Sequence, residues 1–208
     1  MMLSPVIEPD YTSANLTKQT HPNPIFRAIL AAFNARLLAL ADTAAPVSVL
    51  EVGCGEGFVL KYLAEQRPLW RLVGCDLSAG AIAYARRQCP TWIELDVADI
   101  YRLPIPRAAF DLVICSEVLE HLADVPAALA ELKRVSHGHV LITVPHEPFF
   151  RVLARLAVWL HLGPDPEHRQ FWTAGGFRRL MRTHFREVSF AYSTQYQLAL
   201  GQGFIQGS

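Results

Sequence analysis

The sequence has few cysteines, no excess of either charge and no signal-peptide pattern. The four cysteines, Cys54, Cys75, Cys89 and Cys115, show no C-x-x-C spacing, which predicts free buried thiols in a reducing cytoplasm rather than a disulfide or zinc site. The 19 basic and 19 acidic residues balance, so no global charge attracts nucleic acid. Residues 1–10 lack a basic region followed by an apolar run, so no signal peptide is expected.

The length and composition favour one folded domain. The chain has 208 residues, of which 51% are apolar and 18% are charged, which excludes a disordered chain and allows a sizeable core. Residues 1–23 are polar and contain prolines, so we expect a loose N-terminal segment. We expect one domain over residues 24–208, without internal repeats.

Strand and helix patterns alternate along most of the chain. Apolar residues recur at helical spacing over 24–41. Predicted strands and helices then follow in turn, at residues 47–52, 58–66, 71–75, 78–88, 91–97, 110–115, 125–135 and 139–144. The strand at 110–115 is apolar throughout, as expected for a strand buried on both faces. This order predicts an α/β fold with a doubly wound, mostly parallel sheet.

The end of the chain departs from this alternation. Residues 148–162 predict an apolar helix that is too short to span a bilayer, and no transmembrane segment is expected. We expect it to form an apolar lid over a bound substrate, and packing on the sheet, a dimer interface and a membrane surface are the alternatives. Thr173 is expected to cap a later helix, a strand is expected near residues 187–192, and residues 195–200 are the candidate final strand.

Three glycines follow the strand at 47–52 and precede a helix. Gly53, Gly55 and Gly57 are separated by single residues, and such a turn lets the backbone approach a ligand at a helix N-terminus. A dinucleotide fingerprint requires G-x-G-x-x-G. Its last glycine falls on Phe58 here, which disfavours a nicotinamide-dependent oxidoreductase.

The glycine turn resembles motif I of the class I S-adenosylmethionine-dependent methyltransferases. The stretch from Phe110 to Leu122 is similar to the fourth motif of that superfamily, and the matches together cover residues 47–145. The resemblance implies a Rossmann-like, seven-stranded sheet whose last two strands form a hairpin with one antiparallel member. It also implies S-adenosyl-L-methionine as the cofactor, with S-adenosyl-L-homocysteine as the product.

An acid at the end of the second strand is suited to ribose binding. Asp76 lies 19 residues after Gly57, where a carboxylate accepts hydrogen bonds from vicinal ribose hydroxyls. Its alternative role is to stabilise a helix N-terminus. The resemblance assigns Asp76 to the ribose of the cofactor and Asp99 to the adenine amine, with Asp96 as the alternative acid.

The remaining cofactor residues are expected from the same resemblance. Ile100 is expected to pack on the adenine ring, and Glu51 is expected near the methionine part of the cofactor. The other expected cofactor-binding residues are Gly53, Cys54, Gly55, Gly57, Leu77, Cys115 and Ser116.

Methyl transfer depends mainly on alignment of the reacting atoms, and a base is required only if the acceptor loses a proton. His146 and His168 are the candidate catalytic residues, because they occupy loops expected near the acceptor. Glu117 and His121 are weaker candidates, since residues four apart on a helix also pair with each other.

Motifs that the sequence lacks restrict the kinds of acceptor that we expect. No N-P-P-Y or D-P-P-Y tetrapeptide follows the fourth strand, which disfavours nucleobase and glutamine N-methylation, and no residue set suggests a metal. We therefore expect methylation of an O, N or C atom on a small-molecule or carrier-borne acceptor, with an apolar acceptor and a homodimer both left open. The alternative function is a non-catalytic cofactor-binding module or partner subunit.

Overall fold

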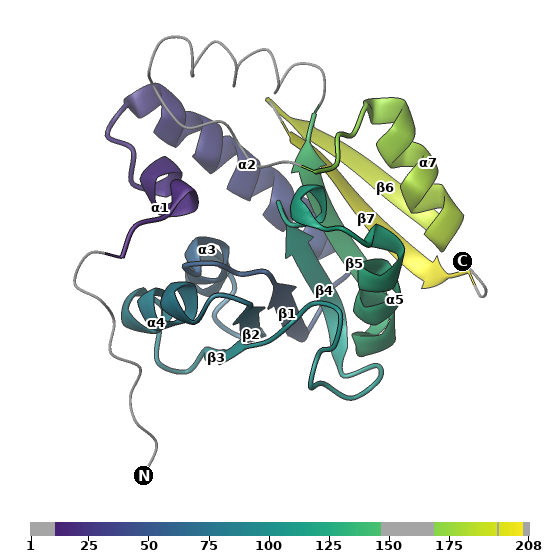
Figure 1. Cartoon of the computed structure of the whole chain (residues 1–208), viewed down its shortest axis with the longest axis horizontal. Helices are drawn as coiled ribbons and strands as arrows, with labels where there is room; N and C mark the ends of the chain where they lie inside the picture. The colour runs from purple at the N-terminus through teal and green to yellow at the C-terminus, as the bar shows by residue number, and fades with distance from the viewer. Residues whose placement is uncertain (1–10, 147–168, 195, 206–208) are drawn as a thin grey trace.

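The structure is a computed structural model and describes residues 11–146, 169–194 and 196–205. Its described residues form one seven-stranded sheet with the strand order β3-β2-β1-β4-β5-β7-β6 (Figure 1). The strands are β1 (Ser48–Val52), β2 (Arg71–Asp76), β3 (Glu94–Val97), β4 (Phe110–Ser116), β5 (Ser136–Pro145), β6 (Phe185–Ser193) and β7 (Tyr196–Phe204). Strands β1 to β5 pair in parallel, whereas β7 is antiparallel to both β5 and β6. The predicted Rossmann-like sheet and its final hairpin are confirmed.

Helices cover both faces of the sheet, as Figure 1 shows. The helices are α1 (Ala14–Gln19), α2 (Pro24–Thr43), α3 (Phe58–Gln66), α4 (Ala79–Gln88), the short 3-10 helix η1 (Leu119–His121), α5 (Val125–Val135) and α7 (Ala174–His184). Successive residues of a strand point to opposite faces of the sheet, so the strands contribute side chains to two apolar clusters. Buried residues of α2, α3 and α4 pack in one cluster, and those of α5 and α7 pack in the other.

Local signals in the sequence place the helix starts. The Ser78 hydroxyl accepts a hydrogen bond from the amide of Ala81 (3.2 Å), and the Thr173 hydroxyl accepts one from Gly176 (3.1 Å). The Thr173 cap was expected, and both caps satisfy amides that lack an intrahelical partner. The strand predicted from residue 91 begins only at Glu94, because the amide of Ile93 closes a turn with Pro90.

The N-terminal segment differs from the prediction. Residues 1–23 were expected to be loose, but residues 14–19 form α1, whose first turn is capped by the Ser13 hydroxyl. Side chains of this segment also bind Glu56, 41–45 residues further along the chain. No sequence pattern indicated these contacts, because the partners are polar and distant in sequence. The expected apolar helix at 148–162 and His168 lie outside the described residues.

Helix α2 meets the length and composition required to cross a membrane, and it is the only described helix that does so. Of the most apolar 18-residue stretch of this helix, 33% is buried inside the protein. Its buried residues include Phe33 and Leu37, which pack in the first core cluster. Core helices also meet this test, so the expected absence of a transmembrane segment stays a prediction.

Candidate functional site

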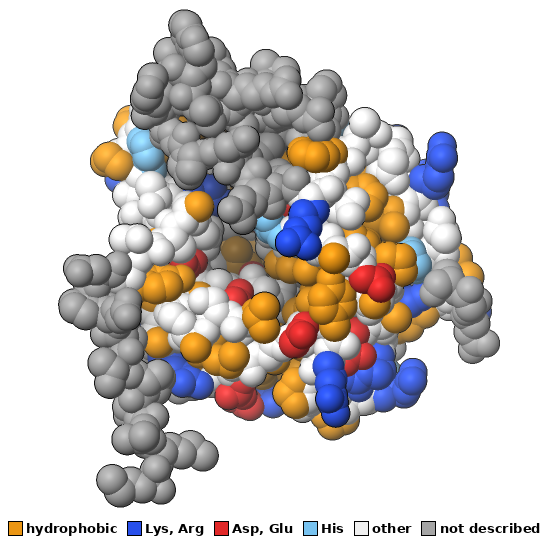
Figure 2. Space-filling model, viewed as in Figure 1, with side chains coloured by type: hydrophobic (Ala, Val, Ile, Leu, Met, Phe, Trp, Pro, Cys, Tyr) orange, Lys and Arg blue, Asp and Glu red, His pale blue; other side chains and the backbone are white. Residues whose placement is uncertain are grey.

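The glycine turn and the acidic residues meet at one edge of the sheet. From β1 the chain continues to β2 and β3 on one side, and β4 lies on the other side of β1. Ligands of open α/β sheets bind at such a switch point, outside the carboxyl ends of the strands. The loops that follow β1, β2, β3 and β4 all open onto this edge. Figure 2 shows a hollow in the viewed face, with hydrophobic and acidic side chains at its margin.

The glycine turn is fixed by its backbone conformation and by close packing. Gly53 has a φ of 76° and Gly57 one of 80°, values that disfavour side chains. A Cβ on Gly53 would lie 2.3 Å from Cγ2 of Val118, and one on Gly57 would lie 2.7 Å from Sγ of Cys89. The turn therefore packs directly on the loop after β4 and on the end of α4.

Asp76 stands at the end of β2 and contacts the glycine turn. Its Oδ2 accepts a hydrogen bond from the amide of Gly55 (2.8 Å), and its Oδ1 accepts one from Ser78 (2.8 Å). Each carboxylate oxygen has lone pairs for further donors. Asp76 thus orders the turn and the start of α4 and still offers acceptors to a ligand hydroxyl. Leu77, the next residue, is 73% exposed.

Glu51 is a buried carboxylate below the glycine turn. It is 2% exposed, and its Oε2 has no hydrogen-bond partner among the described residues. Burial, with the charge of Asp76 as a smaller cause, raises the pKa of Glu51 well above its ordinary value. An unpartnered buried carboxyl group is costly, so this oxygen is placed to receive a donor. Neighbouring Cys54 is also buried.

The third loop carries the two candidate adenine acids. Asp99 is exposed, and its Oδ1 accepts a hydrogen bond from the amide of Tyr101 (2.9 Å). Asp96 lies 3.7 Å from Arg86 in an exposed ion pair. Ile100 is 9% exposed and packs in the second core cluster. Both acids are therefore exposed, and Asp96 already contacts a basic residue.

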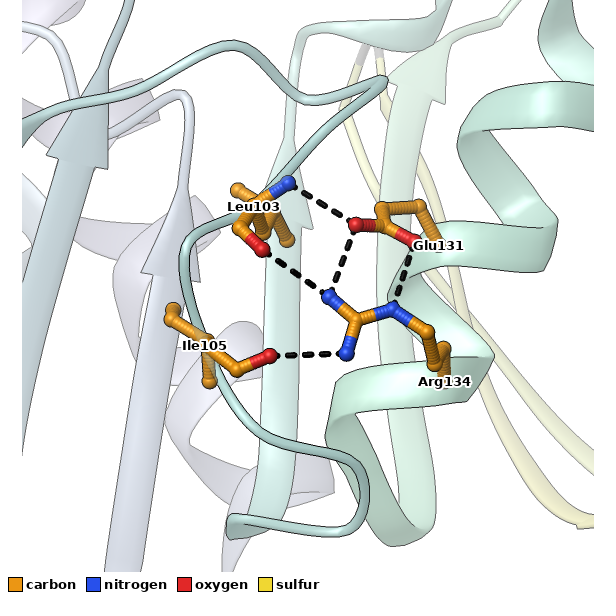
Figure 3. Close-up of polar contacts among 4 residues, drawn as sticks. All are labelled: Leu103, Ile105, Glu131 and Arg134. Atoms are coloured by element: carbon orange, nitrogen blue, oxygen red, sulfur yellow. Dashed lines mark hydrogen bonds and ion pairs between the residues drawn. The ribbon is translucent and has the colours of Figure 1, made fainter.

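The rest of the third loop is held in place by α5 (Figure 3). The Arg134 guanidinium donates to the carbonyls of Ile105 (2.7 Å) and Leu103 (3.0 Å). Glu131 accepts from the amide of Leu103 (2.8 Å) and from Arg134 (2.7 and 2.8 Å). These contacts fix the loop between Leu103 and Ile105, which follows Asp99.

The fourth loop is ordered by β5. Cys115 is fully buried, and the hydroxyls of Ser116 and Thr143 lie 3.0 Å apart. Glu117 has a φ of 57°, which is uncommon outside glycine. Its amide donates to the carbonyl of Thr143 (3.1 Å), and its carboxylate pairs with Lys18 (2.6 Å). Glu117 is thus joined to the N-terminal segment through Lys18, a contact that the sequence did not indicate.

Of the two candidate catalytic histidines, one can be placed. His146 is half-buried directly after β5, with its ring centroid 5.8 Å from that of Tyr192. It therefore belongs to the same edge of the sheet as the loops above. His168 lies outside the described residues.

All four cysteines are free and buried, as predicted. Burial raises the pKa of Cys75 to about 12 and that of Cys89 to about 11. Thiols with such pKa values are poor nucleophiles and metal ligands at neutral pH. Within the described ranges, no group of three or more His, Cys, Asp or Glu residues is placed to hold a metal ion.

A cavity of about 370 Å³ lies away from the glycine turn. It is formed by one face of β2 and β3 and by the loop before β4, where no described helix covers the sheet. Apolar residues such as Val73 and Phe110 line it, together with Arg71 and Glu94 at the amino ends of β2 and β3. Asp96, the alternative adenine acid, also lines the cavity, but no residue of the glycine turn does, so the cavity borders the candidate site without coinciding with it.

The sequence reasoning missed the contribution of the N-terminal segment. Tyr11 donates to Glu56 Oε1 (2.9 Å), Ser13 donates to the same oxygen, and Asn15 donates to Oε2 (2.5 Å). Glu56 lies within the glycine turn, at a position that the motif leaves free. Its role is revealed by these hydrogen bonds and by its burial, since it is 2% exposed.

Comparisons with known proteins agree with this geometry. Residues 50–142 match the model of the methyltransferase domain family. The chain is 35% identical over 108 residues to malonyl-[acyl-carrier protein] O-methyltransferase of Serratia marcescens, which covers 51% of this chain and 41% of the relative. It is 33% identical over 130 residues to trans-aconitate 2-methyltransferase of Methylobacterium nodulans, which covers 59% of this chain and 49% of the relative.

A solved structure with the same fold is magnesium protoporphyrin IX methyltransferase of Synechocystis PCC 6803 with bound S-adenosylhomocysteine. The TM-score is 0.65 at 16% identity, and 91% of each chain is covered. At this identity the likeness concerns the fold. The alignments span less than half the length of the two curated relatives.

Proposed function

We propose that this chain, which belongs to the class I S-adenosylmethionine-dependent methyltransferase superfamily, transfers a methyl group from S-adenosylmethionine to an O, N or C atom of a small-molecule or carrier-borne acceptor. The observation that carries this proposal is the convergence of the glycine turn, Asp76 and Glu51 at the switch point of the sheet.

The residues at the edge fit the cofactor. Asp76 has free lone pairs for the two ribose hydroxyls, while Gly55 holds its carboxylate in place. The unpartnered Oε2 of Glu51 is a fitting acceptor for the ammonium group of the methionine part. Asp99 offers an open carboxylate to the adenine amine, next to the buried Ile100.

When bound, the cofactor supplies an activated methyl group on a sulfonium. The residues of this chain have to bind the cofactor and to align the acceptor, because alignment supplies much of the rate. His146 is the described candidate for accepting a proton from an acceptor that must lose one. The two relatives named for malonyl-carrier and trans-aconitate methylation support a small or carrier-borne acceptor.

Isothermal calorimetry with S-adenosylmethionine, S-adenosylhomocysteine and NADH tests the proposal. We expect both adenosyl ligands to bind, and Asp76→Ala to weaken them more than tenfold, or about 1.5–3 kcal/mol, because a ribose-binding carboxylate is lost. Asp99→Ala and Asp96→Ala form a matched pair. We expect only Asp99→Ala to reduce affinity.

Two results would contradict the proposal. One is the absence of adenosyl binding by folded wild-type protein, and the other is binding that Asp76→Ala leaves unchanged. Binding without methylation of any carboxylate, amine or carbon acceptor in a panel would favour the non-catalytic module.

A further inference from the structure

Residues 11–20, here called the strap, cross the carboxyl edge of the sheet in the order of its strands. The ring of Tyr11 lies against Gly80, with its Cε2 2.8 Å from the position that a Cβ would take. Asn15 lies over the glycine turn, with its Nδ2 3.3 Å from the corresponding position on Gly55. Lys18 reaches Glu117. The strap therefore passes over the loops after β2, β1 and β4, which are neighbours in the sheet.

The first anchor of the strap is the carboxylate of Glu56. All three side chains that donate to it come from the strap: Tyr11, Ser13 and Asn15. Because Glu56 is 2% exposed, it would be a buried charge without these donors, and such a charge is costly. Glu56 and the strap thus stabilise each other.

The second anchor is Glu117 after β4. Its carboxylate lies 2.6 Å from the Lys18 ammonium, and the two side chains are 22% and 28% exposed. The ammonium also stands over the ring of the buried Tyr196, 5.7 Å from the ring centroid. Partial burial strengthens such contacts relative to surface ion pairs. Each end of the strap is therefore held by a charged group of a loop at the candidate site.

Apolar packing contributes little to the position of the strap. Helix α1 has six residues, none of them buried, and a helix this short is not stable by itself. Figure 1 shows it beside α2. A segment held mainly by polar contacts belongs to the parts of a protein that open most readily.

We propose that Glu56 and Glu117 are positioning residues that hold the strap across the cofactor site, so that the strap has to detach before the cofactor enters or leaves. This inference rests on the proposed function. It assigns the exchange of cofactor and product to a movement of residues 11–20, while the glycine turn stays in place.

Stopped-flow binding of S-adenosylhomocysteine to the full chain tests the proposal. A gate and a direct ligand contact have different kinetic signatures. Weakening a gate raises both the association and the dissociation rate constants, whereas removing a contact raises only dissociation. We expect Glu56→Gln and Lys18→Ala each to raise both constants about tenfold, since each removes charge-assisted hydrogen bonds.

Hydrogen exchange of the ligand-free protein supplies the second readout. We expect the amides of residues 16–20 to exchange about tenfold faster in Glu56→Gln than in the wild type. Ser13→Ala removes a donor to Glu56 without changing the glycine turn. It therefore separates the loss of this anchor from a folding defect in that turn. Glu94→Gln is the matched control, because Glu94 forms an exposed ion pair with Arg71, at the amino ends of β2 and β3, and should leave every rate unchanged.

These experiments distinguish an error in the strap proposal from an error in the proposed function. Adenosyl binding by the wild type with equal association rates in Glu56→Gln, Lys18→Ala and the control would overturn the strap as a gate. Faster amide exchange in Glu56→Gln, with no adenosyl binding by the wild type, would instead overturn the proposed function.

Discussion

Two glutamates of neighbouring loops are equally buried but have opposite surroundings. Glu56 follows β1 and is 2% exposed, and Glu120 follows β4 and is 1% exposed. Glu56 accepts hydrogen bonds from three side chains, which lower its pKa against the effect of burial. The Oε2 of Glu120 has no partner among the described residues, and burial, with the charge of Glu117 as a smaller cause, raises its pKa to about 8. Partners rather than burial decide which of the two is ionised.

The largest expected effect is that of Glu120→Gln, which replaces a protonated carboxyl by a neutral group of the same shape. The pKa of Glu120 is raised from 4.5 to about 8, so the folded state keeps a proton that the unfolded state releases. The stability of the wild type therefore falls as the pH rises from 4.5 towards 8. We expect the variant to be more stable by on the order of 4 kcal/mol at pH 8 and by less than about 1 kcal/mol at pH 5.

Urea denaturation at the two pH values measures this difference. His121→Gln is the neighbouring control, because His121 is exposed on the same short helix. Equal gains of Glu120→Gln at pH 5 and pH 8 would show that the carboxyl is not held protonated by the fold.

Glu56→Ala is expected to have the next largest effect and the opposite sign. Because the pKa of Glu56 is lowered from 4.5, its ionised form contributes stability above pH 4.5. That contribution is lost as the pH falls through the folded-state pKa. We expect a loss of about 2 kcal/mol at pH 7, since several charge-assisted hydrogen bonds disappear.

The same denaturation series extended to pH 3 checks the sign. The difference between wild type and Glu56→Ala should shrink below pH 4.5. A difference that stays constant down to pH 3 would assign the loss to packing of the glycine turn rather than to the charge.

Glu131 is a third carboxylate with a partner, but its partner is Arg134 of the same helix and not the strap. Arg134 lowers the pKa of Glu131 and joins it to the third loop. Arg134→Ala should lose about 1.5 kcal/mol of stability, since the loop carbonyls and Glu131 lose their donor. Arg71→Ala, which removes an exposed ion pair, should lose less than about 1 kcal/mol. Equal losses in the two variants would contradict a special role for Arg134.

The fold was largely predictable, because burial of parallel strands leaves continuous apolar runs in the sequence. The predicted strand at 110–115 corresponds to β4, and the candidate final strand at 195–200 corresponds to β7. The glycine turn and Asp76 were predictable for a related reason, since backbone approach and a strand-end acid leave local signals. Their placement at one edge then followed from the topology.

The strap and the ionisation of the two glutamates were not predictable. The donors of Glu56 lie 41–45 residues before it, and no local pattern links polar residues over that distance. Glu117 was compared with His121, four residues away, whereas its partner Lys18 is 99 residues away. The pKa of Glu120 depends on which groups surround it in three dimensions.

The smallest expected effect is that of Tyr11→Phe, which removes one of the three donors to Glu56 and keeps the ring. Two donors remain, so we expect a loss of about 0.5–1 kcal/mol and a rise in the pKa of Glu56. The hydrogen bond also contributes to raising the pKa of Tyr11 to about 12, after burial. Tyr84→Phe is the matched control, because its ring lies 6.1 Å from that of Tyr11 and its hydroxyl has no hydrogen bond with the described residues. If both variants lost the same stability, the ring rather than the hydroxyl would hold this end of the strap.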